Sequence, residues 1–118
     1  MKRVLIVDGD EECRMYLQRE LEKRYEVHIC ARGDQAVERI EALRPDALII
    51  YLSLPYRDGL TVLRQLEYRP PAILALTSLV RTKILEDAAS LGVRDMLIYP
   101  CYIKTIVEHL DSLLCSRT

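Results

Sequence analysis

Short apolar runs alternate with segments of helical period along the whole chain. Most of these runs are rich in Val, Ile, Leu and Ala with little polar alternation, which is typical of strands buried on both faces of a sheet. The predicted strands are residues 3–7, 26–30, 47–51, 72–76 and 95–98.

Between the strands, apolar residues recur every three or four positions, as they do on the buried face of a helix. The first predicted helix begins after Asp10 with two acidic residues and runs to about Arg24. Pro45 closes the second helix, and Gly92 is well placed as the left-handed residue that ends the fourth. The predicted helices are residues 11–24, 33–44, 59–66, 82–91 and 103–114.

This alternation of strands and helices predicts an α/β fold, a parallel sheet with helices on both faces. Right-handed crossovers favour a doubly wound arrangement, and five strands with five helices fit the flavodoxin-like strand order 2-1-3-4-5. In such folds the ligand site lies at the carboxyl ends of the strands. Asp8, Tyr51, Thr77 and Tyr99 end or follow four of the predicted strands, so we expect them at one edge of the sheet.

Size and composition indicate one globular domain over residues 1–118, of which half are apolar. The formal net charge of −1 offers no basic patch for nucleic acid. The apolar runs are too short for a membrane span, and the run that follows Arg3 is too short for a secretion signal. We therefore expect a cytoplasmic domain that binds neither nucleic acid nor membrane.

The four cysteines are irregularly spaced, and neither they nor the two histidines form a pattern typical of a metal site. We expect reduced thiols that pack as small apolar side chains. The cysteines are Cys13, Cys30, Cys101 and Cys115.

Four stretches carry recognisable motifs: Val4–Asp8, Leu54–Gly59, Leu74–Ser78 and Tyr99–Pro100. Each is a weak signal alone. Their order and spacing together resemble the receiver domain of two-component response regulators, and the resemblance covers essentially the whole chain.

In that family, two adjacent acids after the first strand and an acceptor Asp after the third hold Mg²⁺. The acceptor attacks a phosphoryl group, and a Lys after the fifth strand and a hydroxyl after the fourth engage the product. The resemblance places Gly9 where the second acid is expected, Tyr51 where the phosphoacceptor is expected, and Tyr99, before Pro100, where the Lys is expected. Thr77 and Met96 fall at the family's switch positions, and the Tyr99–Pro100 bond is expected to be cis, as the family's Lys-Pro bond is.

These departures weaken the family's chemistry. A phenol has a pKa near 10 and is a poor nucleophile without a nearby base. Mg²⁺ prefers several hard oxygen ligands in near-octahedral geometry, whereas only Asp8 and Asp10 remain as weak candidates. We therefore expect no cofactor, weak or absent Mg²⁺ binding, and no catalytic residue.

We hypothesise that Tyr51 and Tyr99 fill the vacated pocket, cover Thr77 between them, and place one hydroxyl on Asp8. The alternative is that either ring points outward at the sheet edge. Thr77 is a candidate switch hydroxyl, but a local backbone bond is favoured for it. Asp10 is a candidate metal ligand, but a helix cap is favoured.

The predicted function is a regulatory signalling module, not an enzyme, that acts independently of phosphorylation through protein contacts. The partners that the resemblance implies are an effector domain, a histidine kinase or another receiver. A homodimer through the fourth helix, fifth strand and fifth helix is one possibility. Candidate residues on that face are Arg81, Lys83, Arg94, Asp95, Lys104, Glu108 and Asp111.

Two alternatives stay open. One is a working phosphorelay receiver with a different acceptor, for which Ser53 is a weak candidate because no His lies nearby in the sequence to activate it. The other is a flavodoxin-like domain that binds a nucleotide or flavin. The acidic turn after the first strand, from Asp8 to Glu12, disfavours it because it would repel phosphate.

Overall fold

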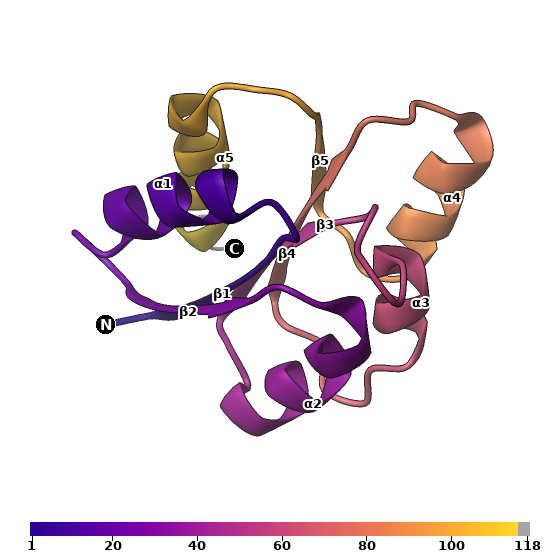
Figure 1. Cartoon of the computed structure of the whole chain (residues 1–118), viewed down its shortest axis with the longest axis horizontal. Coiled ribbons are helices and arrows are strands. Elements are labelled where there is room, and N and C mark those ends of the chain that lie inside the picture. Colours follow the sequence, from indigo (N-terminus) through magenta and orange to yellow (C-terminus); the bar gives the residue numbers. More distant parts are fainter. Residues whose placement is uncertain (116–118) are drawn as a thin grey trace.

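Five parallel strands form one sheet in the order β2-β1-β3-β4-β5 in the computed structural model, which describes residues 1–115 (Figure 1). The predicted α/β fold of flavodoxin-like topology is therefore confirmed. The strands are β1 (Arg3–Val7), β2 (Glu26–Cys30), β3 (Ala47–Tyr51), β4 (Ala72–Thr77) and β5 (Asp95–Ile98).

Helices α1 and α5 cover one face of the sheet, and α2, α3 and α4 lie on the other (Figure 1). Among residues 1–115, no helix combines the length and the apolar character that a membrane span requires. Residues 116–118, which the predicted domain includes, lie outside the described part. The helices are α1 (Glu11–Leu21), α2 (Gly33–Leu43), α3 (Gly59–Arg64), α4 (Thr82–Ser90) and α5 (Ile103–Cys115).

Two helices end earlier than predicted. Helix α1 stops at Leu21 because the ring of Tyr25 packs into the layer between the sheet and α1–α5, and its hydroxyl donates to the Asp111 carboxylate at 2.6 Å. Helix α3 stops at Arg64 because the chain beyond it is tied to α2: the backbone N–H of Glu67 donates to the Glu41 carboxylate at 2.6 Å. Both causes are long-range contacts.

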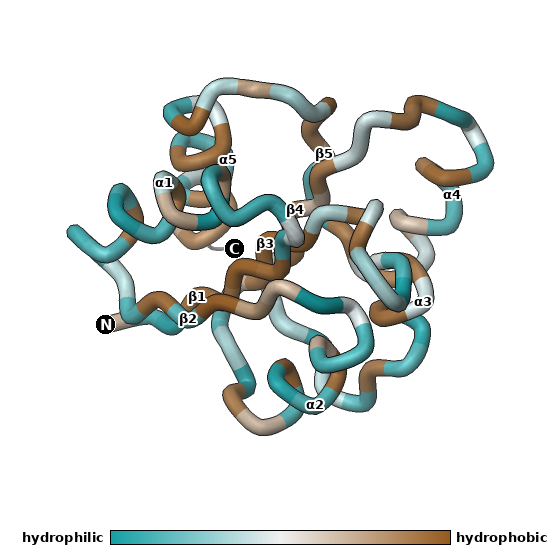
Figure 2. The backbone as a smooth tube through the Cα atoms, viewed as in Figure 1, coloured by the Kyte–Doolittle hydropathy of each residue, from teal (hydrophilic) through white to brown (hydrophobic). Residues whose placement is uncertain are grey.

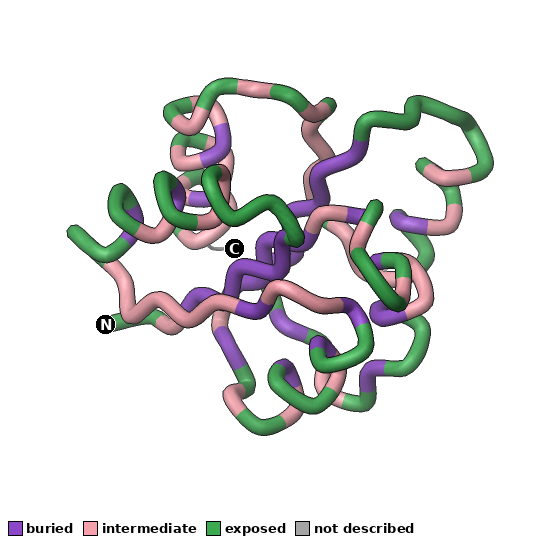
Figure 3. The backbone as a smooth tube through the Cα atoms, in the orientation of Figure 1, coloured by how far each residue is buried: buried purple, intermediate pink, exposed green. Residues whose placement is uncertain are grey.

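The sheet separates two apolar layers, seen as a hydrophobic, buried centre inside a polar shell (Figures 2 and 3). Along β1, Val4 and Ile6 pack toward α1 and α5, whereas Leu5 and Val7 pack toward α2 and α3. All four side chains are fully buried, as a strand with helices on both sides requires. Gly92, with φ +97°, is the predicted left-handed residue after α4.

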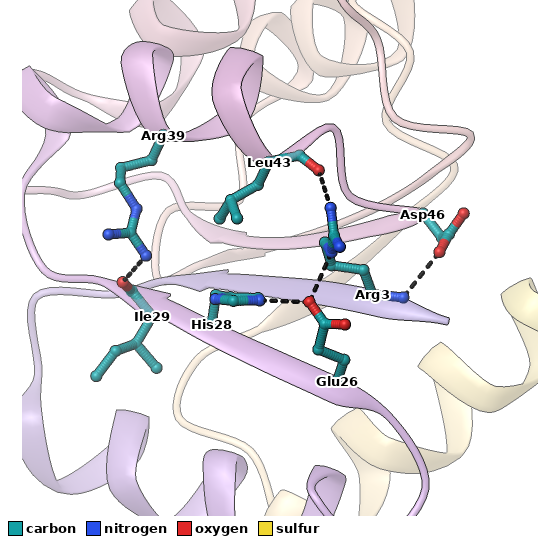
Figure 4. Close-up of polar contacts among 7 residues, drawn as sticks. All are labelled: Arg3, Glu26, His28, Ile29, Arg39, Leu43 and Asp46. Carbon is teal, nitrogen blue, oxygen red and sulfur yellow. Dashed lines mark hydrogen bonds and ion pairs between the residues drawn. The ribbon is translucent and has the colours of Figure 1, made fainter. Parts of the chain in front are cut away.

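A polar cluster closes the amino-terminal edge of the sheet (Figure 4). The Arg3 guanidinium donates to the Glu26 carboxylate at 2.7 Å and to the Leu43 carbonyl at 2.7 Å, and the Arg3 backbone N–H donates to Asp46 at 2.7 Å. His28 and Arg3 both contact Glu26 and hold the pKa of its carboxyl below the ordinary value. These bonds fix the register of β1 against its neighbours and leave the opposite edge for the site.

Candidate functional site

The carboxyl ends of β1, β3, β4 and β5 meet at one edge of the sheet. Asp8 follows β1, Tyr51 ends β3 and Thr77 ends β4. Tyr99 follows β5, and its backbone N–H donates to the Thr77 carbonyl at 2.7 Å. The predicted gathering of these four residues is confirmed.

The two tyrosines at this edge, Tyr51 and Tyr99, form one contact that we call the tyrosine pair. Their ring centroids lie 4.8 Å apart with an interplanar angle of 31°, within the range that aromatic pairs prefer. Both residues are half-buried, and Tyr51 packs against the α1–α5 layer. The two rings therefore lie together at the carboxyl ends of β3 and β5.

The hydroxyl contact differs from the prediction. Tyr99 Oη donates to Asp10 Oδ2 at 2.9 Å and not to Asp8. Asp8 is only 1% exposed, and its Oδ1 already accepts the backbone N–H of Asp10, whereas Asp10 is exposed. The predicted covering of Thr77 is also wrong, because Thr77 lines a cavity beside α3 and α4 while Tyr51 faces the other layer.

Asp10 joins the tyrosine pair to the start of α1. Its Oδ1 accepts the backbone N–H groups of Glu12 and Cys13 at 3.0 and 3.3 Å, which confirms the predicted helix cap. The Tyr99 hydroxyl and then these N–H groups lower the pKa of the Asp10 carboxyl. The same hydrogen bond raises the pKa of the Tyr99 phenol above its ordinary value. One carboxylate thus caps a helix and holds a ring in place.

Tyr99→Phe should lower the free energy of unfolding by about 0.5–1 kcal/mol, a modest loss because the bond is partly exposed to water. Asp10 has a lowered pKa in the folded state, so the difference between wild type and variant should be complete above pH of about 4 and shrink as pH falls further. Tyr99 has a raised pKa, so the difference should be complete below pH of about 10 and shrink above it. Urea unfolding across this pH range measures the effect, and a difference that does not change with pH would rule out the Asp10 contact as its source.

The carboxyl group of Asp8 is buried, and its surroundings are only partly polar. Burial raises its pKa above the ordinary value, and the N–H of Asp10 and the nearby Cys13 thiol offset this in part. Within the described residues its Oδ2 has no hydrogen-bond partner. Burial and then the Asp8 charge raise the pKa of the Cys13 thiol to about 12, so this thiol stays protonated at neutral pH.

The residues present do not fit the Mg²⁺ ion that the family implies. The unpartnered Oδ2 of Asp8 is one available oxygen, but Asp10 is committed to the cap and to Tyr99. Gly9 adds no ligand, and a Cβ there would lie 2.8 Å from Cδ of Pro55, so the loop after β3 already occupies that space. One carboxylate oxygen falls well short of octahedral coordination.

The loop after β3 rests on the start of α2. The Gly33 backbone N–H donates to the Pro55 carbonyl at 3.0 Å, and a Cβ on Gly33 would lie only 1.8 Å from the Arg57 carbonyl oxygen. At the end of the loop, Asp58 caps α3 by accepting the N–H and hydroxyl of Thr61 at 3.0 and 2.9 Å. The sequence marked this loop by its Pro and Gly residues but did not show what it packs on.

Gly33→Ala should lower the free energy of unfolding by about 1–3 kcal/mol, because the new methyl group meets backbone and not a movable side chain. Urea unfolding measures the loss. Gln35→Ala, an exposed change in the same helix, is the matched control and should stay within about 0.5 kcal/mol of wild type. A Gly33→Ala protein as stable as this control would show that the loop does not rest on α2.

The remaining predicted positions are Thr77, Met96, Ser53 and Pro100. The Thr77 hydroxyl is used locally, donating to the carbonyl and accepting the N–H of Leu79, both at 3.1 Å, as favoured for it. Met96 packs toward the α2–α3 layer, and Ser53 is exposed. The Tyr99–Pro100 bond is cis, as the resemblance implied.

Several charges predicted on the α4–β5–α5 face are paired within the domain. Lys83 contacts Asp87 at 3.3 Å, and Asp95 contacts Nδ1 of His109 at 2.5 Å. Asp111 is turned toward α1, where it pairs with Arg24 at 2.7 Å. Exposed apolar side chains accompany these charges, namely Leu85 on α4, Ile98 on β5 and Tyr102 just before α5.

Sequence reasoning missed three contacts that shape the site: the Tyr99–Asp10 bond, the packing of Pro55 on Gly9, and the role of Arg14. The Arg14 guanidinium donates to the Asp8 carbonyl at 2.9 Å and secures the turn after β1. Arg14 lies four residues after Asp10, and this helical spacing places its side chain over that turn. The spacing was the feature of the sequence that could have predicted the contact.

Comparison with known proteins agrees with the geometry. The family described as "Response regulator receiver domain" matches residues 4–111. The chain is 34% identical over 115 residues to "Response regulator MprA" of Mycobacterium ulcerans and 33% identical to that of Mycobacterium avium. Each alignment covers 95% of this chain and 50% of the relative, so the chain spans about half the length of these curated relatives.

Solved structures share the fold. The "BeF3-activated N-terminal receiver domain" of RstA from Klebsiella pneumoniae superimposes with a TM-score of 0.82 at 26% identity, covering 97% of this chain and 99% of that one. A two-component response regulator from Clostridium difficile gives a TM-score of 0.87 at 21% identity, covering 97% and 96%. The sequence match and the shared topology place this chain in the family of response regulator receiver domains of two-component systems.

Proposed function

We propose that this receiver domain regulates without accepting phosphate at the usual position. The observation that carries the proposal is the tyrosine pair, whose ring centroids lie 4.8 Å apart and whose Tyr99 hydroxyl is bonded to Asp10. The resemblance puts these rings at the positions where the family has its acceptor and its Lys. A neutral phenol does not replace a carboxylate nucleophile, and Tyr99 brings no positive charge to the position where the family has its Lys.

Support also comes from the acidic side of the site. Asp10 is engaged by the helix cap and by Tyr99, and Gly9 offers no carboxylate. Only the buried Asp8 has a carboxylate oxygen left for Mg²⁺. The conformational equilibrium of the domain is then set by the sequence itself or by a bound partner.

The output of such a domain is contact with other proteins. We propose a single domain over residues 1–118 in a cytoplasmic protein, regulatory and not enzymatic, that contacts an effector domain, a kinase or another receiver. The α4–β5–α5 face supports pairing of two copies, because exposed Ile98 and Tyr102 lie there beside a mixture of charges.

The test is incubation with acetyl phosphate and Mg²⁺, followed by intact-mass measurement, with a receiver that carries the full acidic set as positive control. We expect no added phosphoryl group on this protein while the control is labelled. Stoichiometric phosphorylation that hydroxylamine removes would overturn the proposal, and a hydroxylamine-stable phosphate on Ser53 or Tyr51 would favour a relay with a non-standard acceptor.

A further inference from the structure

A second feature of the same sheet edge is a pocket of about 270 Å³ on the opposite side of the sheet from the tyrosine pair. We call it the α3–α4 pocket. Its floor is formed by Leu52 and Thr77, which are 7% and 4% exposed, and its walls by Leu60 and Ile84 from the first turns of α3 and α4. Leu79 contributes to the rim.

This pocket is unfilled because few side chains of α4 are buried against the sheet. Ala88 is its one fully buried side chain, and Ile84 is only half-buried. A separate hollow of about 240 Å³ beside Met96 lies on the other flank of α4. The sequence has no Phe or Trp to fill either space. The pocket opens to solvent at the carboxyl edge of the sheet, which is where α/β folds bind their ligands, so it is a candidate binding site.

The lining indicates the chemistry of that occupant. None of the lining residues is basic, so the pocket offers no positive charge to an anion. Asp58 is exposed and keeps its negative charge, while both of its oxygens accept bonds in the α3 cap. The hydroxyl of Thr77 is used by Leu79, so the floor between Leu52 and Ile84 is apolar. Ser53 and Ser78 are exposed and offer hydroxyl groups at the mouth.

We propose that the α3–α4 pocket binds a small neutral aromatic compound that carries a hydroxyl or amine group. The ring lies against Leu52, Leu60 and Ile84, and the polar group reaches the serines at the mouth. A single benzene ring occupies apolar cavities of about 150 Å³, so this pocket has room for two fused rings. The lining excludes nucleotides and other phosphates, for which it has no cation.

The occupant is a small molecule and not a side chain of a partner, because the pocket reaches down to the ends of β3 and β4 and its floor is nearly sealed. A partner protein would instead rest on Leu79 and Val80, which are exposed outside the floor. Occupation would press on Thr77 and Ile84 and so bias the position of α4. This regulatory consequence, unlike the binding itself, rests on the proposed phosphate-independent function.

The test uses 2-naphthol, whose fluorescence can be followed directly because the protein has no Trp. We expect saturable binding with a Kd below about 1 mM, which is reasonable for a ligand of this size. Naphthalene-2-sulfonate, which has the same rings and a negative charge, should bind at least ten-fold more weakly. Amide NMR shifts should centre on Leu52, Leu60, Thr77 and Ile84.

Ile84→Phe, which fills the pocket, should weaken 2-naphthol binding at least ten-fold. Leu85→Phe, on the exposed side of the same turn, should leave it unchanged, and thermal unfolding checks that both variants are folded. Absence of saturation, equal binding of the sulfonate, equal binding by Ile84→Phe, or shifts confined to Leu79 and Val80 would each overturn the proposal. Phosphorylation assays without the ligand report on the proposed function separately, so the two can fail independently.

Discussion

Restoring three family residues together should turn this domain into one that takes phosphate from acetyl phosphate and Mg²⁺. The variant is Gly9→Asp, Tyr51→Asp and Tyr99→Lys combined. The first two changes supply carboxylates for Mg²⁺ and a nucleophile, and the third supplies a cation for the product. Tyr51→Asp alone should react at least about 100-fold more slowly than the triple variant, the scale of losing a group that stabilises charge in a transition state.

The rate of labelling is measured by intact mass, with hydroxylamine sensitivity to identify an acyl phosphate. The matched control is Gly9→Asn, Tyr51→Asn and Tyr99→Lys, which has nearly the same shapes without the carboxylates and should stay unlabelled. The new Cβ at position 9 must displace the ring of Pro55, so the fold of the triple variant is checked by unfolding. If Tyr51→Asp alone reacts as fast as the triple variant, the rest of the site is intact and our account of it is wrong.

Tyr51→Ala should lower the free energy of unfolding by about 2–4 kcal/mol, somewhat less than a fully buried ring because Tyr51 is half-buried. The ring packs on the α1–α5 layer on one side and on Tyr99 on the other, so its removal leaves a gap at the centre of the site. Tyr51→Phe keeps those contacts and should cost less than about 0.5 kcal/mol.

Urea unfolding of the two variants separates the ring from its hydroxyl. At Tyr51 we expect removal of the ring to cost more than removal of the hydroxyl alone. At Tyr99, by contrast, the hydroxyl itself is bonded to Asp10. Equal losses for Tyr51→Ala and Tyr51→Phe would mean that the Tyr51 hydroxyl, and not its packing, holds the site together. A negligible loss for Tyr51→Ala would mean that the ring does not fill the site in solution.

The fold was predictable because its signals are local and repeated. The buried run from Val4 to Val7 and the equally apolar β3 and β4 can be satisfied only between two helical layers. The helix cap at Asp10 and the left-handed Gly92 follow from residue type alone. Where the prediction was wrong, at the ends of α1 and α3, distant partners of Tyr25 and Glu67 decided the boundary.

The sequence predicted which residues lie at the site but not which of them contact one another. The topology brought Tyr51 and Tyr99 to one edge, as expected. The carboxylate that Tyr99 contacts depends on how deeply Asp8 is buried and on where the turn after β1 positions Asp10. The spacing of residues in the sequence determines neither. The same holds for the approach of Pro55 to Gly9, which required knowing how the loop folds back.

The most direct measurement is an amide NMR titration of the wild-type domain with beryllofluoride and Mg²⁺, with the triple variant titrated in parallel. Beryllofluoride mimics a phosphoryl group on a carboxylate that has Mg²⁺ beside it. We predict an unchanged spectrum for the wild type and a saturable response around positions 8, 51 and 77 in the triple variant. A saturable response of the wild type at those positions would show that the site still assembles around a phosphoryl group and would contradict the account.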